Sequence, residues 1–140
     1  MAMDATYDRV VLDTNVFVAA GFNPRSHSAR LLDAVRLGRL RMVWDSSTQE
    51  EVEHVLRQIP RLSWTSVAAL FRAEDKFGGT TQPQNFSFVP DPADRKFAAL
   101  ADAARVPLVT SDRGLLMAAS QMKIPVLKPG EFRSRCELAQ

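Results

Sequence analysis

Short apolar runs and helical patterns alternate along this chain. Residues 9–12, 40–44, 106–110 and 124–127 have the length and apolar pattern of short strands. Apolar spacing or a start signal predicts helices at 16–22, 27–37, 45–59, 64–77, 91–105, 113–120 and 130–137. Because strands that alternate with helices form βαβ units, we predict a single three-layer α/β/α domain over residues 1–140, with a central, mainly parallel sheet.

Polar residues at the expected helix ends support this division. Ser26 or Ser28 can cap the helix over 27–37, which Gly38 would close. Ser47 and Glu50 have the spacing of a capping box. Ser63 can cap 64–77, and Asp91 is followed by proline at the first position of its helix. Residues 78–90 lack helical periodicity and are interpreted as a loop, with a possible short strand at 86–88.

Composition narrows the class of protein. The 140 residues are 46% hydrophobic and 24% charged, which argues against disorder, collagen and coiled coil. Cys136 is the one cysteine, so a reducing compartment is expected and no intramolecular disulfide can form. The longest apolar stretch, Val16–Phe22, is far shorter than a membrane span, and residues 1–8 lack the basic region of a signal peptide. We therefore expect a cytoplasmic protein without a membrane partner.

Two acids stand where predicted strands end. Asp13 follows the strand at 9–12, and Asp112 follows the strand at 106–110. Ligands of open α/β sheets bind beyond the carboxyl ends of the strands, so both acids are candidates for a site. Each can also be explained as the cap of the helix that follows it.

Other acids lie on predicted helices. Asp94 falls on nearly the same face as Phe97 and Ala101, the core side of its helix, where a carboxylate needs a cation or several donors. It can also be explained as a first-turn acid that the helix dipole favours. Asp91 is better explained as a helix cap. Glu51 and Glu53 each border the apolar stripe of their helix, whereas Glu50 points to solvent; periodicity alone does not choose between the first two.

A cluster of Asp13, Asp94, Asp112 and one glutamate would have a specific chemistry. Carboxylates that share a pocket repel one another unless a cation neutralises them. Ligation by oxygen alone favours Mg²⁺ or Mn²⁺, which can activate water for attack on a phosphodiester. Without these four acids, 18 basic residues would face 12 acidic ones, an excess of six positive charges that suits a polyanionic substrate.

Four short motifs resemble those of PIN-domain nucleases. The stretch Val11–Phe17 (VLDTNVF) resembles the opening of that family, and Glu51-Val52 with Val55-Leu56 resembles its second acidic motif, which favours Glu51 over Glu53. Residues 91–97 (DPADRKF) resemble the third motif, with Asp94 in the place of the acid, and Thr110-Ser111-Asp112 resembles the fourth. The resemblance spans residues 9–127 in the family's order.

The resemblance implies a Mg²⁺- or Mn²⁺-dependent endoribonuclease, often the toxin of a bacterial toxin–antitoxin pair of the VapC type. It implies that Asp13, Glu51, Asp94 and Asp112 bind metal and activate water. Asn15 and Thr110 would then be supporting polar groups, and Asp91 and Ser111 are secondary candidates. Ser111 stands where glycine is frequent, and Ala93 where another acid is common. Family members commonly form homodimers and are inhibited by an antitoxin protein.

Alternative functions start from the same residues. Asp13 could be the nucleophile of a phosphohydrolase, although Asn15 stands where that chemistry usually has a second acid. A catalytically inactive PIN-like module that binds protein or RNA is a further alternative. The loop 78–90 and the helix 64–77 are candidates for contact with substrate or antitoxin.

Several residues have simpler explanations than a functional role. His27 lies in a polar, serine-rich segment typical of a solvated side chain. Arg36, Arg39 and Arg41 could bind phosphate or form a plain solvated patch. Trp64, Phe71 and Phe77 are best explained as residues that pack a core or a dimer face.

Overall fold

The sheet is central, parallel and four-stranded, as the alternating pattern predicts. A computed structural model describes residues 7–136 of the chain. The strands are β1 (Arg9–Leu12), β2 (Arg41–Met42), β3 (Leu108–Val109) and β4 (Val126–Leu127). They lie in the order β2-β1-β3-β4, and every pair is parallel. The prediction of an α/β/α domain with a mainly parallel sheet is confirmed.

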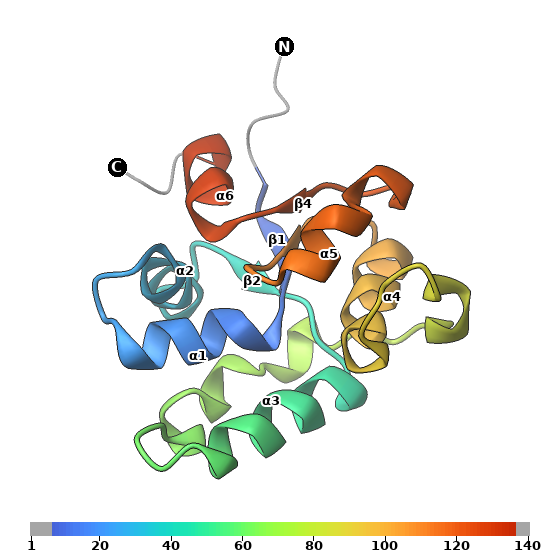
Figure 1. Cartoon of the computed structure of the whole chain (residues 1–140). Coiled ribbons are helices and arrows are strands. Elements are labelled where there is room, and N and C mark those ends of the chain that lie inside the picture. The colour runs from blue at the N-terminus through green and yellow to red at the C-terminus, as the bar shows by residue number, and fades with distance from the viewer. Residues whose placement is uncertain (1–6, 137–140) are drawn as a thin grey trace.

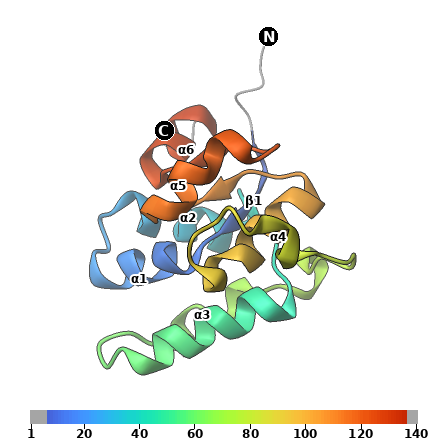
Figure 2. The ribbon, with the colours of Figure 1, turned by 45° about the vertical axis from the view of Figure 1, so that its right-hand side comes forward.

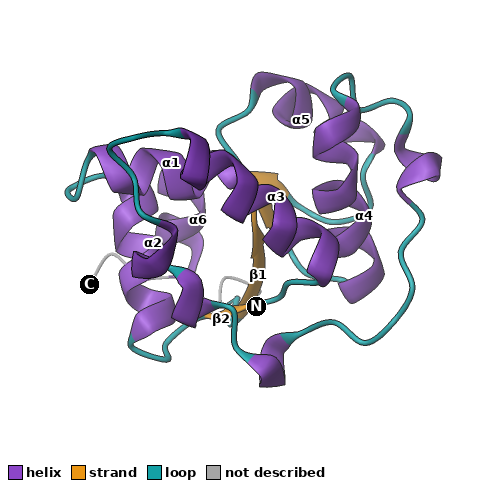
Figure 3. Ribbon diagram, turned by 90° about the horizontal axis from the view of Figure 1, so that it is seen from below, coloured by secondary structure: helices purple, strands orange, loops and turns teal. Residues whose placement is uncertain are grey.

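Helices cover both faces of this sheet. They are α1 (Thr14–Phe22), α2 (His27–Arg36), α3 (Ser46–Gln58), α4 (Arg95–Ala104), α5 (Arg113–Met117) and α6 (Pro129–Cys136). Seen from below, α1, α2 and α6 lie on one side of β1, and α4 and α5 lie on the other (Figure 3). Figures 1 and 2 both show α3 along the bottom of the molecule, beneath α1. In residues 7–136, no helix is long and apolar enough to cross a membrane.

The strand order places a topological switch point between β1 and β3. From β1 the chain moves to β2 on one side, and it later returns to β3 on the other side of β1. In open α/β sheets the connections then diverge beyond the carboxyl ends of these two strands and leave a crevice there. Asp13 follows β1 directly, and Thr110 follows β3 directly. Asp13 and Thr110 therefore lie at this crevice.

The helix caps of the structure match the predicted caps only in part. The Ser26 hydroxyl accepts the Ala29 backbone N–H at the start of α2, and Gly38 follows α2 at a φ of 77°. The expected capping box of Ser47 and Glu50 is wrong. Asp45 instead caps α3 and pairs reciprocally with Thr48. A carboxylate two residues earlier captures the free N–H groups, so Ser47 is already inside the helix.

The ends of two further helices differ from those predicted from the sequence. The Asp91 carboxylate accepts the Ala93 N–H and starts a 3₁₀ turn, Pro92–Asp94, which continues into α4. The helix expected over 113–120 is the short α5 followed by a 3₁₀ turn, Ala118–Gln121. The helix expected over 130–137 corresponds to α6, which is described as far as Cys136; residue 137 lies outside the described residues.

The helix predicted over 64–77 is wrong. That segment consists of three 3₁₀ turns, Trp64–Ser66, Ala68–Leu70 and Ala73–Asp75. Its buried residues are Trp64, Val67 and Leu70, a spacing of three that matches the three-residue period of a 3₁₀ turn. Ser63 makes no cap through its side chain.

The loop expected over 78–90 contains a 3₁₀ turn, Pro83–Phe86, and no strand at 86–88.

Aromatic side chains around this segment form part of the core. The Phe71 ring lies 5.3–5.7 Å from those of Phe17, Trp44 and Trp64. The packing role of Trp64 and Phe71 is therefore confirmed, and partly buried Phe77 also packs against the core. The Trp44 indole donates to the Arg72 carbonyl at 2.7 Å, which holds the segment against the end of β2.

Candidate active site at the carboxyl edge of the sheet

Asp13 is buried at the junction of β1 and α1, with 2% of its surface exposed. Its Oδ1 accepts the Thr14 backbone N–H at 2.8 Å, so it does cap α1. Its Oδ2 accepts the Thr110 hydroxyl at 2.7 Å. These bonds hold the carboxylate in one orientation at the switch point. The capping and the functional interpretations of Asp13 are therefore compatible.

Thr110 connects the two strand ends. Its fully buried hydroxyl donates to Asp13 and accepts the backbone N–H of Asp112 at 2.8 Å. The Asp112 carboxylate in turn accepts the Leu115 N–H at 2.9 Å and caps α5. Thr110 is thus a polar group that positions both acids, the geometry expected of a supporting residue.

Asp94 faces the other two acids from the start of α4. Burial, and then the negative charges of Asp13, Asp112 and Asp91, raise its pKa from 3.8 to about 7, and a side-chain hydrogen bond to Asp112 adds to this. Its own carboxylate makes no cap at α4. The expectation from helical periodicity, that Asp94 lies on a face toward the protein interior, matches its partial burial beside buried Phe97.

Burial also raises the pKa of Asp13, from 3.8 to about 6. The charge of Asp112 acts in the same direction, while hydrogen bonds from Thr110, Thr14 and Asn15 oppose it. Hydrogen bonds favour the charged form, so burial must outweigh three donors to raise the pKa of Asp13, with the charge of Asp112 adding to it. The crevice therefore holds Asp13 and Asp94 where their charged forms are disfavoured.

The two candidate glutamates have different partners. Glu51 Oε1 lies 3.1 Å from Lys96 Nζ of α4, and both side chains are 24% exposed. Glu53 pairs with Arg57 on its own helix at 2.7 Å. Glu50 is exposed, as expected. Among these three acids, the described contacts connect Glu51 alone to the helix that carries Asp94.

The remaining candidates lie around the cluster. The Asn15 side chain is exposed, and its backbone N–H is a donor to Asp13. Asp91 caps the turn before α4 and contributes charge to Asp94. Ser111 is exposed between Thr110 and Asp112. The sequence analysis assigned no role to Lys96, although it is part of the third motif and lies two positions after Asp94.

The chemistry of this cluster fits a hard divalent cation. Its donors are carboxylate oxygens, and a cation would relieve the repulsion that raises their pKa values. Beside Asp13, the Thr14 hydroxyl is buried without a hydrogen-bond partner in the described part of the chain, so a polar atom remains to be satisfied there. Within residues 7–136, no three histidine, cysteine or acidic side chains are yet arranged to hold a metal ion. Side-chain movement would have to complete the site.

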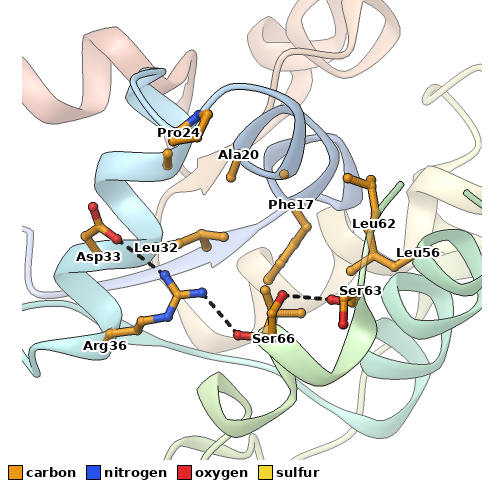
Figure 4. A pocket seen from close by; sticks show the side chains of 13 residues that line it. Phe17, Ala20, Pro24, Leu32, Asp33, Arg36, Leu56, Leu62, Ser63 and Ser66 are labelled. Atoms are coloured by element: carbon orange, nitrogen blue, oxygen red, sulfur yellow. Dashed lines mark hydrogen bonds and ion pairs between the residues drawn. The ribbon is translucent and has the colours of Figure 1, made fainter. Parts of the chain in front are cut away.

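Two of the three arginines considered for phosphate binding have partners away from this crevice. Arg41 pairs with Arg9 at the start of β1, the opposite end of the strand from Asp13, and it binds Asp75 at 2.8 Å. Arg36 binds Asp33 and the Ser66 carbonyl beside a groove of about 240 Å³ between α1, α2 and residues 62–67 (Figure 4). That groove is mostly apolar and contains none of the four acids.

Comparisons with known proteins agree with this geometry. A model of the PIN domain family matches residues 9–114, about three quarters of the chain. The crystal structure of PAE2754 from Pyrobaculum aerophilum is similar in fold, with a TM-score of 0.58 at 15% identity over 97% of this chain and 92% of that one. No curated protein matches. The chain therefore belongs to the PIN domain family, whose members are generally nucleases that bind divalent metal ions.

Proposed function

We propose that this protein is a metal-dependent endoribonuclease that hydrolyses phosphodiester bonds of RNA. The observation that carries the proposal is the convergence of Asp13, Asp94 and Asp112 at the switch point, where burial raises the pKa values of Asp13 and Asp94 and the charges of neighbouring carboxylates add to the increase. A cluster so unfavourable on its own is typical of a site built to hold a cation.

The chain's own residues have separate tasks in this proposal. Asp13 and Asp112 would hold Mg²⁺ or Mn²⁺ from the strand ends, and Asp94 would complete the set of ligands. Thr110 orients both strand-end acids through its two hydrogen bonds. Glu51, placed by Lys96, positions the attacking water. When bound, the cation supplies an activated water and neutralises charge on the phosphodiester.

Burial of Asp13 argues against the phosphohydrolase alternative. A nucleophilic carboxylate must reach the phosphorus of its substrate, yet Asp13 is 2% exposed and both of its oxygens accept hydrogen bonds. This arrangement favours a fixed ligand over an attacking group.

The proposal is tested with a pool of structured RNAs incubated with Mn²⁺, Mg²⁺ or EDTA. We expect cuts that need the metal and disappear in Asp13→Asn, while Glu50→Gln, which removes an exposed acid, keeps them. Retained cleavage in Asp13→Asn would contradict the assignment. If cleavage is absent and Mn²⁺ also fails to raise the Tm of the wild type, the inactive-module alternative becomes the better one.

We further propose that the protein acts in the cytoplasm as a homodimeric toxin held in check by an antitoxin. This role rests on the motifs' resemblance to toxins of the VapC type. Expression of the wild type should arrest bacterial growth, and expression of Asp13→Asn should not. Growth that continues in both cases would contradict the toxin role, and light scattering of the purified protein measures the dimer.

Residues 64–77 and 78–90 remain our candidates for contact with substrate or antitoxin. Ser66 and Val67 line the groove in Figure 4, which gives a partner a mostly apolar surface. Deletion of residues 79–85 should change substrate choice or antitoxin affinity. Unchanged behaviour in both assays would reject the loop's part in the proposal.

A further inference from the structure

A second pocket begins beside the acidic cluster. Its volume is about 460 Å³, within the range of roughly 300–1,000 Å³ common for small-molecule sites. Ser111, the residue between Thr110 and Asp112, forms one wall, and Lys128 and Pro129, which follow β4, form another. The pocket thus lies at the same carboxyl edge of the sheet as the acids. Its walls are mostly apolar.

The remaining walls come from α1, α2 and α6. Ala19 of α1 and His27, the first residue of α2, face Gly130 at the start of α6. Figures 1 and 2 both show α2 and α6 as neighbours. A Cβ on Gly130 would lie 3.0 Å from His27 Cδ2 and 3.2 Å from Nε2. Glycine at this position therefore leaves room for the imidazole edge beside the pocket.

The hydrogen bond to Arg133 fixes which nitrogen of His27 carries the proton. Arg133 Nη1 lies 2.8 Å from His27 Nδ1. Because a guanidinium can only donate, Nδ1 must accept, and the imidazole hydrogen is then on Nε2. His27 is exposed, as expected, yet it is held by a partner and presents a defined N–H donor at the pocket.

Lys128 is the group of the pocket that could meet a phosphate. Lys128 brings an exposed cation. Glu131, the acid of the pocket, is engaged by the Lys128 backbone N–H at 2.9 Å. These groups match the parts of one nucleotide. The apolar wall suits the face of a base, the fixed donor and the hydroxyl suit its edge, and the cation suits the phosphate.

We propose that this pocket binds the nucleotide next to the scissile phosphodiester and selects its base. The base lies against the apolar wall of Ala19 and Pro129, His27 Nε2 donates to an acceptor on the base edge, and Lys128 contacts the adjacent phosphate. This inference rests on the proposed function, since it names the RNA subsite that adjoins the acidic cluster. It assigns His27 a role in base choice and none in bond cleavage.

The first test is the base composition at cleavage sites in a randomised RNA treated with Mn²⁺. The wild type should prefer particular bases at one position beside the cut. His27→Ala should weaken that preference about five- to tenfold, the value of one hydrogen bond, whereas His27→Gln, which keeps a donor, should retain part of it. His54→Ala is the matched control, because His54 is an exposed histidine of α3 outside the pocket. The Tm increase caused by Mn²⁺ should be equal in all four proteins.

The second test separates this inference from the proposed function. Binding of short A, C, G and U homopolymers is measured in EDTA by fluorescence anisotropy, so no cleavage is needed. Base discrimination that His27→Ala loses and His54→Ala keeps supports the pocket even if the wild type cuts no RNA. Equal binding of the four homopolymers by the wild type, or discrimination that His27→Ala retains, overturns it.

Lys128→Ala provides an independent readout of the phosphate contact. It should weaken binding of every homopolymer similarly and reduce the slope of log affinity against log salt by about one. An unchanged slope contradicts the phosphate contact that the proposal assigns to Lys128.

Discussion

Asp13 is a buried acid and Asp75 is a partly buried acid with little of its side chain exposed, and the surroundings of the two are opposite. The Asp75 side chain is 6% exposed and binds the Arg41 guanidinium at 2.8 Å near the amino end of the sheet. Asp13 is 2% exposed at the carboxyl end, where the nearby charges belong to Asp94 and Asp112. Asp33 and Glu53 likewise have arginine partners.

The difference separates acids that stabilise the fold from the acids to which we assign a ligand. A paired carboxylate gains from its partner as soon as the chain folds. Carboxylates that face one another make the folded state less stable until a cation arrives, and such strain is common where stability has been given up for activity. Four predictions, made with three substitutions, sharpen or break this comparison.

Asp94→Asn should have the largest effect. It removes a charged oxygen from the proposed cation site without removing a helix cap, because Asp94 makes none. We expect RNA cleavage to fall by about a thousandfold or more, the scale of losing a principal electrostatic group, and the Tm increase with Mn²⁺ to shrink. Cleavage within tenfold of the wild type would place Asp94 with the structural acids.

Glu51→Gln should have an intermediate effect. Since Glu51 contacts Lys96 on the helix that follows Asp94, and we assign it the attacking water, we expect cleavage to fall about 10- to 100-fold, as for groups that support a metal site. Glu53→Gln and Glu50→Gln on the same helix are matched controls, and their rates should stay within about twofold. A larger loss in Glu53→Gln than in Glu51→Gln would reverse the choice between these two acids.

Asp75→Asn should behave in the opposite way to the site acids. It weakens the charged hydrogen bond with Arg41, whose side chain is 53% exposed, so screening keeps the cost near 1 kcal/mol. The Tm should fall by a few degrees while the cleavage rate is unchanged. Thermal melting and the RNA assay on one preparation measure the Tm and the cleavage rate. A large loss of cleavage would mean that Asp75 does not differ from the acids of the proposed site.

The stability difference between Asp94→Asn and the wild type should depend on pH. In the folded protein without metal the pKa of Asp94 is about 7 and that of Asp13 about 6, against 3.8 ordinarily. The folded state therefore binds more protons than the unfolded state between about pH 4 and 7, and its stability falls as pH rises through that window.

Melting in EDTA checks this sign. Asp94→Asn should match the wild type near pH 4 and exceed it by a few degrees at pH 8, and Mn²⁺ should reduce the gap. Asp33→Asn, which removes an exposed acid paired with Arg36, should show no such gain. A constant difference across the pH range would mean that Asp94 is not destabilised by its neighbours.

The positions of the site acids could be predicted from sequence because they follow from local rules. A strand that ends at Leu12 or Val109 delivers the next residues to one edge of a parallel sheet, and helical periodicity places Asp94 on the side of Phe97. The strand order that brings β3 beside β1 could not be predicted in the same way, because the apolar runs do not show which strands pair.

Other features depended on contacts that no local pattern contains. The spacing of Trp64, Val67 and Leu70 suits a 3₁₀ turn as well as one side of an α-helix, and packing against Trp44 and Phe71 decides between them. The Lys96–Glu51 contact joins positions 45 apart, so periodicity could place Glu51 and Glu53 equally well. Arg133 holds His27 from a distance of 106 positions.

The hydrogen bond between Thr110 and Asp13 joins residues 97 positions apart. During synthesis, Asp13 leaves the ribosome long before Thr110, which orients it, and long before Asp112. A growing chain that has not reached residue 112 has no assembled cluster and should be unable to cut the message from which it is being translated. The sequence separation of these residues would in this way delay the proposed nuclease activity until residue 112 has been made.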